Sequence, residues 1–149
     1  MKPYNTIDTK PQALNDMLVK YETTSTSTVR LILAANKGIK ADTISDLVSI
    51  SNHKKDFFAG LLNLSVKTLD RYTSEGKSLS PSNGEMVLKL ISLYRKGAEV
   101  FGSVKSFNNW LDKPSIGLGN SLPVTFMYTS GGIDLIQEEL SRIEFGDLA

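Results

Sequence analysis

Residues 101–149 decide the fold, and they read FGSVKSFNNWLDKPSIGLGNSLPVTFMYTSGGIDLIQEELSRIEFGDLA. They contain the only tryptophan, Trp110, and glycines and prolines divide them into short segments. The final segment has apolar residues spaced by three, four and three positions, which predicts an amphipathic helix. The residues of this stripe are Ile133, Ile136, Leu140 and Ile143. A small helical module of this kind carries no evident chemistry, and it is typical of a segment that presents a surface.

Two shorter helices are expected ahead of the amphipathic one. Residues 103–111 predict the first, and its inward side chains are expected to be Val104, Phe107, Trp110 and Leu111. Residues 116–120 predict a glycine-containing loop, after which Ser121 is expected to cap the second helix. Thr129 or Ser130 is expected to cap the last helix. Core packing is the expected role of the large apolar side chains, because such short helices need them to hold together.

The composition is that of a globular protein. The chain of 149 residues has a formal net charge of +1 and no cysteine, and it is long enough for one domain or two small helical subdomains. The missing cysteines exclude disulfides, thiolate nucleophiles and cysteine-bound metals. Because no apolar run could span a bilayer and the first residues lack a signal-peptide pattern, we expect a cytoplasmic protein.

Charge is unevenly distributed along the chain. Residues 51–78 carry five basic and three acidic residues, whereas residues 134–147 carry one arginine and five acidic residues. A basic middle and an acidic end suggest different partners for the two regions, although ordinary solvated helix faces would give the same pattern.

The second informative stretch is residues 54–72, KKDFFAGLLNLSVKTLDRY. A helix-turn-helix needs a small residue where its helices cross, a turn that tolerates left-handed backbone, and apolar residues that fix the second helix. Ala59 is the small residue, Asn63 occupies the turn, and Leu64 and Leu69 follow it. Other apolar residues are expected on the inner faces of the pair: Phe58, Leu62, Val66 and Tyr72. A plain helical hairpin packed in a core is the alternative interpretation.

Ser65 is the expected N-cap of the second helix, which leaves polar side chains near its N-terminal half facing outward. In a helix-turn-helix these positions contact bases and phosphates. The candidate DNA-binding residues are Lys54, Lys55, Ser65, Lys67, Thr68, Asp70 and Arg71. The net charge of this segment is modest for DNA binding, and a dimer would double the contact.

The chain divides into four regions and is predicted to be all-α. A polar N-terminal segment is expected at 1–26, the helix-turn-helix region at 27–79, a connecting helix at 80–101 and a small helical domain at 102–149. The connecting helix is expected to be contacted from both sides and to join the two halves.

Two helices are expected before the helix-turn-helix pair. Residues 27–38 predict the first, with Val29, Ile32 and Leu33 on one face and Gly38 as the C-terminal cap. Residues 41–50 predict the second, with inward residues Ile44, Leu47 and Val48.

The connecting helix has two possible starting points. Ser80 followed by Pro81 is typical of an N-cap and first helical position. Asn83 followed by Gly84 favours a turn, which would delay the start to Glu85.

No catalytic constellation is found. His53 is the only histidine, so it cannot assemble a usual zinc site, and we expect it at the surface near a helix start. Gly117 and Gly119 lack the strand and the Gly-Lys-Ser/Thr of a phosphate-binding loop. Glu138 and Glu139 point about 100° apart on a helix, which does not suit two carboxylates acting together. We therefore expect no enzyme, no cofactor and no bound metal.

A characteristic order of residues runs through the C-terminal third: Val100-Phe101-Gly102, Trp110-Leu111, Pro114, Leu118-Gly119, Leu122-Pro123, Thr129, Gly131 or Gly132, Leu140, Arg142-Ile143 and Gly146. This pattern, over residues 98–149, resembles the toxin-binding domain of the Xre/MbcA/ParS antitoxins. Upstream, the residues similar to the Xre-type helix-turn-helix are Leu64-Ser65, Thr68-Leu69, Arg71 and Leu79-Ser80-Pro81. Asn83 and Gly84 depart from the family, which usually has helix formers there.

The resemblance implies an antitoxin of a bacterial type II toxin–antitoxin pair. The usual partner is a RES-domain toxin that degrades NAD, which the antitoxin neutralises by binding it and blocking its active site. Autorepression of the operon would use the helix-turn-helix bound to operator DNA. A homodimer is expected, because Val29, Ile32 and Leu33 exceed what so small a helix-turn-helix needs to cover.

The acidic C-terminal end is the expected toxin-binding element. A toxin site that holds the pyrophosphate of NAD should be basic, so carboxylates of the tail could compete for it while apolar side chains add contact. The candidate toxin-binding residues are Glu138, Arg142, Glu144, Phe145, Asp147, Leu148 and Ala149. Simple terminal disorder is the alternative.

Two other classes of function remain open. The chain could be a DNA-binding transcriptional regulator or partition-type protein without a toxin partner. It could also be a protein-interaction adaptor whose helix-turn-helix has lost DNA binding. The identity of the neighbouring gene distinguishes an antitoxin from the other two classes of function. Salt-dependent binding of the chain to its own promoter distinguishes the adaptor from the two DNA-binding classes.

Overall fold

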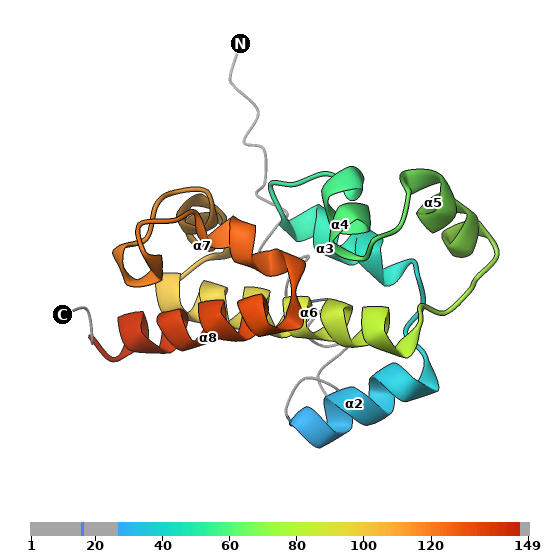
Figure 1. Cartoon of the computed structure of the whole chain (residues 1–149), viewed down its shortest axis with the longest axis horizontal. Helices are drawn as coiled ribbons and strands as arrows, with labels where there is room; N and C mark the ends of the chain where they lie inside the picture. The colour runs from blue at the N-terminus through green and yellow to red at the C-terminus, as the bar shows by residue number, and fades with distance from the viewer. Residues whose placement is uncertain (1–15, 17–26, 147–149) are drawn as a thin grey trace, which may run out of the picture.

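The chain folds around one long helix, α6 (Pro81–Phe101), in the computed structural model, which describes residue 16 and residues 27–146 (Figure 1). Every regular element in those residues is a helix, which confirms the predicted all-α class. The other elements are α2 (Thr28–Lys37), α3 (Thr43–Ile50), α4 (Lys55–Leu61), α5 (Val66–Ser74), α7 (Val104–Leu111), the 3-10 turns η1 (Ile116–Leu118) and η2 (Pro123–Tyr128), and α8 (Ser130–Glu144). The predicted polar segment at 1–26 lies outside the described residues except for position 16.

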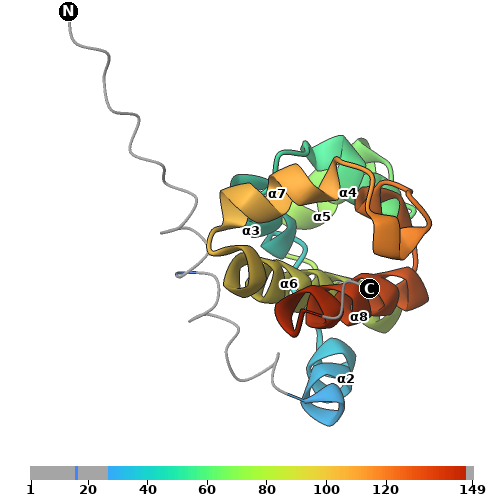
Figure 2. The ribbon, with the colours of Figure 1, turned by 90° about the vertical axis from the view of Figure 1, so that its left-hand side faces the viewer.

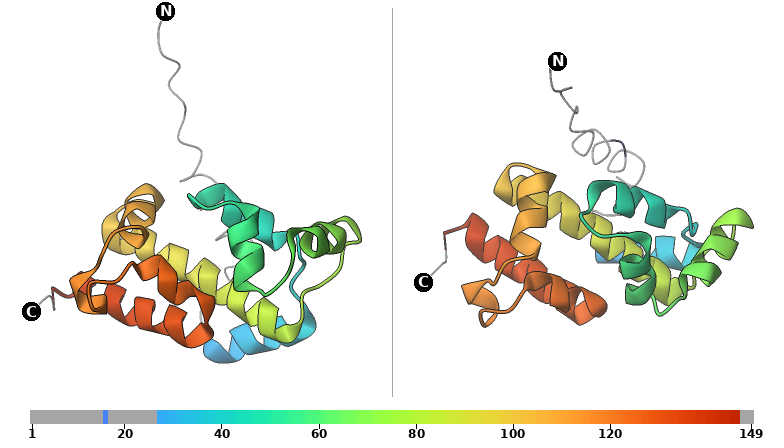
Figure 3. Two further views of the ribbon diagram at one scale, coloured as in Figure 1. Left: turned by 45° about the horizontal axis from the view of Figure 1, so that its top comes forward. Right: turned by 90° about the horizontal axis from the view of Figure 1, so that it is seen from above.

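The remaining helices pack around α6. α2 lies below α6 in the view of Figure 1, α8 lies alongside it, and α3–α5 and α7 lie above its two ends (Figures 1 and 2). Figure 3 shows from two further directions that α7 and the α3–α5 group are separated along the length of α6. Packing on both sides buries nine residues of α6.

α6 begins at Pro81, which decides between its two predicted starting points. The Ser80 hydroxyl accepts a hydrogen bond from the Asn83 backbone N–H at 3.2 Å, and Pro81 occupies the first turn. Gly84 is buried inside the helix, where a Cβ would lie 3.2 Å from Ile39 Cγ1 and 3.5 Å from Ala35 Cα. The prediction of a turn at this glycine was therefore wrong, because close packing against the end of α2 favours glycine here within a helix.

Side-chain hydrogen bonds also cap α2 and α8, and the cap of α8 is one of the two residues predicted for it. The hydroxyl of Ser27 accepts from the Arg30 N–H at 3.2 Å at the start of α2. The hydroxyl of Thr129 accepts from the Gly132 N–H at 2.9 Å at the start of α8. Such caps satisfy backbone donors that have no partner within the helix.

α2 buries only a narrow stripe. Leu31 and Ala35 are buried against the rest of the chain. Val29, Ile32 and Leu33 share the expected apolar face but point outward, and they are 67%, 45% and 62% exposed. Three large aliphatic side chains therefore share an apolar face of α2 that no other described residue covers, and such contiguous exposed apolar patches are typical of interaction surfaces.

Two predictions about local packing are wrong. Ser121 does not cap η2, whose N-cap position is Leu122 with no side-chain cap. Instead, Ser121 pairs through its backbone with Ser115, whose N–H donates to the Ser121 carbonyl at 3.0 Å. Val66 is 37% exposed rather than inward, because it opens α5 before the helix reaches the core at Leu69.

Aromatic side chains fill the core at the far end of α6. Phe107 of α7 is fully buried, and its ring meets Tyr94 edge-on with the centroids 5.3 Å apart. A Cβ on Gly97 would overlap the Phe107 ring, so α7 can approach α6 only because that position is glycine. Burial raises the pKa of Tyr94 to about 12, with the Asp112 carboxylate adding to the rise and Ser51 opposing it. The expected core role of Phe107 is confirmed, whereas Trp110 is half-buried beside it.

Among the helices that the structure describes, none is both long and apolar enough to cross a membrane.

Candidate functional surfaces

α4 and α5 are joined by the tight turn that the sequence predicts. Asn63 has φ 55°, in the left-handed region that asparagine tolerates. The Leu64 N–H donates to the Ala59 carbonyl at 2.9 Å and closes the turn. Ala59 is 1% exposed, so a larger side chain there would push the two helices apart. Leu69, also 1% exposed, anchors α5 in the core.

The N-terminus of α5 is held by its predicted cap. The Ser65 hydroxyl accepts from the Thr68 N–H at 3.0 Å and also donates to Thr68 Oγ1 at 2.9 Å. Both candidate DNA-binding hydroxyls are therefore engaged with each other. They stabilise the start of α5 in this structure.

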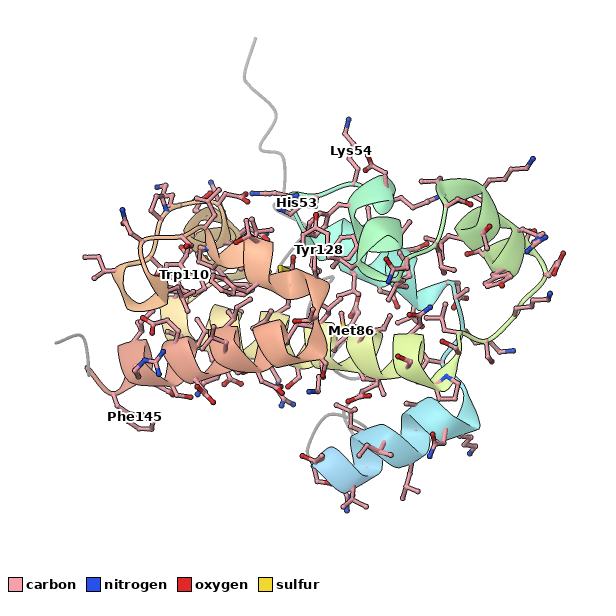
Figure 4. The ribbon with its side chains drawn as sticks, in the orientation of Figure 1. His53, Lys54, Met86, Trp110, Tyr128 and Phe145 are labelled. Atoms are coloured by element: carbon pink, nitrogen blue, oxygen red, sulfur yellow. The ribbon has the colours of Figure 1, made fainter. Side chains whose placement is uncertain are left out.

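The remaining five candidate DNA-binding residues are exposed, but two of them form an ion pair with each other. Lys55 Nζ lies 2.7 Å from Asp70 Oδ1, so these two residues link α4 to α5 and neutralise each other. Lys54 extends into solvent at the N-cap of α4 (Figure 4), and Lys67 and Arg71 are exposed on α5. The outward cationic groups of this surface are therefore Lys54, Lys67 and Arg71.

The acidic character of α8 is largely cancelled by ion pairs, which the sequence count did not reveal. Lys89 Nζ of α6 lies 2.9 Å from Asp134 Oδ1 and bonds the Ser130 hydroxyl at 2.7 Å. Lys96 of α6 pairs with Glu144 near the other end of α8. These two lysines hold α8 against α6. Because they neutralise Asp134 and Glu144, the surface of α8 carries less net negative charge than the sequence of residues 134–147 indicates.

Glu139 is a buried carboxylate inside the small C-terminal domain. It is 1% exposed, and its Oε2 accepts from Arg142 Nε at 2.8 Å and pairs with Nη2 at 2.7 Å. Gly117 of η1 lies directly against this carboxylate, since a Cβ on Gly117 would overlap it. The Glu139–Arg142 pair therefore supports the loop that carries η1, a role that the sequence did not suggest for either residue.

The candidate toxin-binding residues have different environments. Glu138 is exposed, Arg142 has a side chain 40% exposed beside Glu139, and Glu144 is paired with Lys96. Phe145 is 75% exposed just after α8 (Figure 4). The other three candidates, Asp147, Leu148 and Ala149, lie outside the described residues.

Ile116 was missed by sequence analysis. It is 87% exposed, more than any other large apolar residue in the part of the chain that the structure describes. The neighbouring Leu118 is only 5% exposed, so the loop packs through Leu118 and leaves Ile116 outside. Nothing in the local sequence distinguishes the two side chains, because a glycine-rich loop has no fixed periodicity.

His53 lies at the contact between the α3–α5 group and the C-terminal helices. Its Nε2 lies 3.2 Å from Asp112 Oδ1, just beyond α7, and its ring stacks on Phe57 with the centroids 4.3 Å apart. Phe57 in turn meets Tyr128 of η2 edge-on with the ring centroids 6.0 Å apart, and Figure 4 shows His53 and Tyr128 near each other. His53 lies just before the start of α4, as predicted, but it is half-buried at this junction and not at the surface.

A buried amide reinforces the same junction. Asn108 is 1% exposed, and its Nδ2 donates to the carbonyl of Ile50, the last residue of α3, at 2.8 Å. The carbonyl would otherwise be an unsatisfied buried acceptor at a helix end. The two halves are therefore held together by specific polar and aromatic contacts as well as by α6.

A cleft of about 370 Å³ opens where α2, α6 and α8 meet. Lys89, Asp134 and Glu85 contribute its charged groups, and Lys89 is committed to Asp134 and Ser130. Among the described residues there is no cluster of histidine and carboxylate side chains that could hold a metal ion.

Comparison with known proteins identifies the C-terminal part. Residues 96–146 match the family model of the antitoxin Xre/MbcA/ParS C-terminal toxin-binding domain. No curated protein matches the chain. The matched segment begins within α6 and includes α7, η1, η2 and α8, and it confirms the resemblance inferred from the C-terminal motif.

Proposed function

We propose that this chain, whose residues 96–146 match the toxin-binding domain of Xre/MbcA/ParS antitoxins, is a type II antitoxin that neutralises a RES-type toxin. The family match carries the proposal, because this domain is described by its binding of a toxin. The chain itself would act by occupying the toxin, without catalysis and without a cofactor.

Blocking of the toxin active site is assigned to the chain end that follows α8. The exposed Phe145 supports this, because it starts the tail with an apolar side chain available for contact. Glu144 is committed to Lys96, so the negative charge would come chiefly from Asp147, with Leu148 and Ala149 beside it. Arg142 and Glu138 would contact the toxin beside the active site.

Autorepression is assigned to the α4–α5 pair acting as a helix-turn-helix. The Asn63 turn, the Ser65 cap and the outward Lys67 and Arg71 support this assignment. Because affinity for DNA comes mostly from phosphate neutralisation, a single copy with so few outward cations would bind weakly.

A homodimer would double the DNA contacts, and the outer face of α2 is the proposed interface. Val29, Ile32 and Leu33 form a contiguous apolar face on one helix, which suits self-complementary packing around a two-fold axis. Sedimentation of a Leu33→Glu variant checks this: it should behave as a monomer, and an unchanged dimer would place the interface elsewhere.

Co-expression with the product of the adjacent gene tests the proposal as a whole. We expect that product to be toxic alone and to deplete cellular NAD, and to be silenced when it co-purifies with this chain. Full neutralisation by a chain lacking residues 144–149 would reject the active-site plug while leaving the antitoxin role standing.

The second candidate function is a DNA-binding regulator or partition-type protein without a toxin partner. The α4–α5 geometry favours it over an adaptor, because the turn and the cap present α5 outward. A harmless neighbour that does not bind, together with salt-dependent binding of the chain to its own promoter, would put this function first.

A further inference from the structure

The η1 loop presents Ile116 to solvent from a well-ordered support. The Ser115 N–H donates to the Ser121 carbonyl at 3.0 Å, and the Asn120 N–H donates to the Ser115 carbonyl at 2.9 Å. Gly119 and Asn120 reverse the chain with φ 66° and 61°. These bonds close the loop on itself, so its tip has little freedom to fold Ile116 inward.

The base of the loop is equally fixed. Leu118 is buried, and Gly117 rests on the Glu139 carboxylate that Arg142 holds in place. Glu139 is 1% exposed, and an unpaired carboxylate buried to that extent would be strongly destabilising. The support of the loop therefore depends on the ion pair between Glu139 and Arg142. The loop is therefore preorganised before any partner binds.

An exposed isoleucine has no evident stabilising role in this position. Burial of an isoleucine side chain stabilises a fold by removing apolar surface from water, and at 87% exposure Ile116 gains little of this stabilisation. A rigid loop that exposes one large apolar side chain has the form of an interface anchor, because little conformational entropy is lost on binding.

We propose that Ile116 is a second toxin-binding element, which inserts into an apolar pocket on the toxin away from the active site. The inference rests on the proposed antitoxin function, because Ile116 lies within the segment that matches the toxin-binding domain. The pocket would be rimmed by hydrogen-bond acceptors facing Arg142, whose side chain is 40% exposed next to the loop. An apolar contact also suits this domain, because Asp134, Glu139 and Glu144 are already paired internally.

The proposal divides neutralisation between two parts of one domain. The η1 loop would supply affinity, and the tail would block the active site. A chain without the tail would then still bind the toxin but would not silence it, whereas a chain without the anchor would lose the complex.

The test measures toxin affinity of the full-length chain with single substitutions. The probe is the purified product of the adjacent gene, and the variants are Ile116→Asp, Ile116→Ala and the matched control Asn109→Asp. Asn109 is exposed on α7, so its replacement adds the same charge to the same domain on a different element from the loop. Thermal melting of each variant checks the fold, which substitution of so exposed a side chain should leave intact.

We expect Ile116→Asp to raise the Kd by at least about tenfold and Ile116→Ala by less, with Asn109→Asp close to wild type. Wild-type affinity in both Ile116 variants would overturn the anchor while leaving the antitoxin function in place. Failure of the wild-type chain to bind the toxin would overturn both. A change in the oligomeric state of the Ile116→Asp chain alone would assign the loop to a second copy and reject the toxin anchor.

Discussion

Gly97 shows how one missing side chain sets the packing of the C-terminal domain. A Cβ at this position would overlap the ring of Phe107, which is fully buried against α6. Gly97→Ala should therefore lower the free energy of unfolding by about 1–3 kcal/mol, because α7 must shift away. Gly131→Ala is the matched control: it lies in α8 with open space around it, and it should be neutral or raise stability by about 0.5–1 kcal/mol. Urea denaturation measures both, and equal stability of the two variants would contradict the packing argument.

At the scale of elements, α5 is a helix whose outward face has few free charges. Lys67 is exposed there, whereas Asp70 is neutralised by Lys55 of α4. If α5 contacts phosphates, Lys67→Ala should weaken promoter binding for all sequences alike and reduce the salt slope by about 1. Lys105→Ala is the control, because Lys105 is exposed on α7 away from α5. The measurement is the promoter affinity of both variants from low to high salt concentration. If Lys67→Ala leaves the slope of log affinity against log salt unchanged, Lys67 does not contact a phosphate.

The whole molecule does not divide at the boundary of the family match. The matched segment starts at residue 96, yet α8 is tied to α6 through Lys89 and Asp134, and Tyr94 packs on Phe107. Residues 96–146 alone should therefore show little cooperative melting, because the fragment lacks residues 81–95, which make up most of α6. Residues 27–146 should melt cooperatively as the full chain does. Circular dichroism against temperature makes the comparison, and a sharp transition in the short fragment would establish it as an independent domain.

Local chemistry was sufficient to predict where the helices lie. Ser27, Ser65, Ser80 and Thr129 cap the helices that they were expected to begin, because a capping hydroxyl acts within three residues of its own position. The left-handed turn at Asn63 follows from the same short-range preferences. The C-terminal motif likewise sufficed to identify the toxin-binding domain that residues 96–146 match.

The candidate sites were less predictable, because their properties depend on partners distant in the chain. Glu144 was expected to offer an acidic group to the toxin, but its carboxylate is paired with Lys96 of α6. Lys96 lies 48 residues away in the sequence, so local reasoning could not find this pair. His53 was expected at the surface, and its partner Asp112 comes from the other half of the molecule.

The sequence by itself determined the helical class, the caps at Ser65, Ser80 and Thr129 though not the one expected at Ser121, and the family that residues 96–146 match, because periodicity, capping and motif order are carried by residues close together in the chain. Only the tertiary structure decided which charges remain free, which face of α2 is uncovered, and that Ile116 rather than Leu118 meets solvent. Those outcomes depend on packing between residues far apart in the sequence, as where Gly84 and Gly97 let α2 and α7 approach α6 closely.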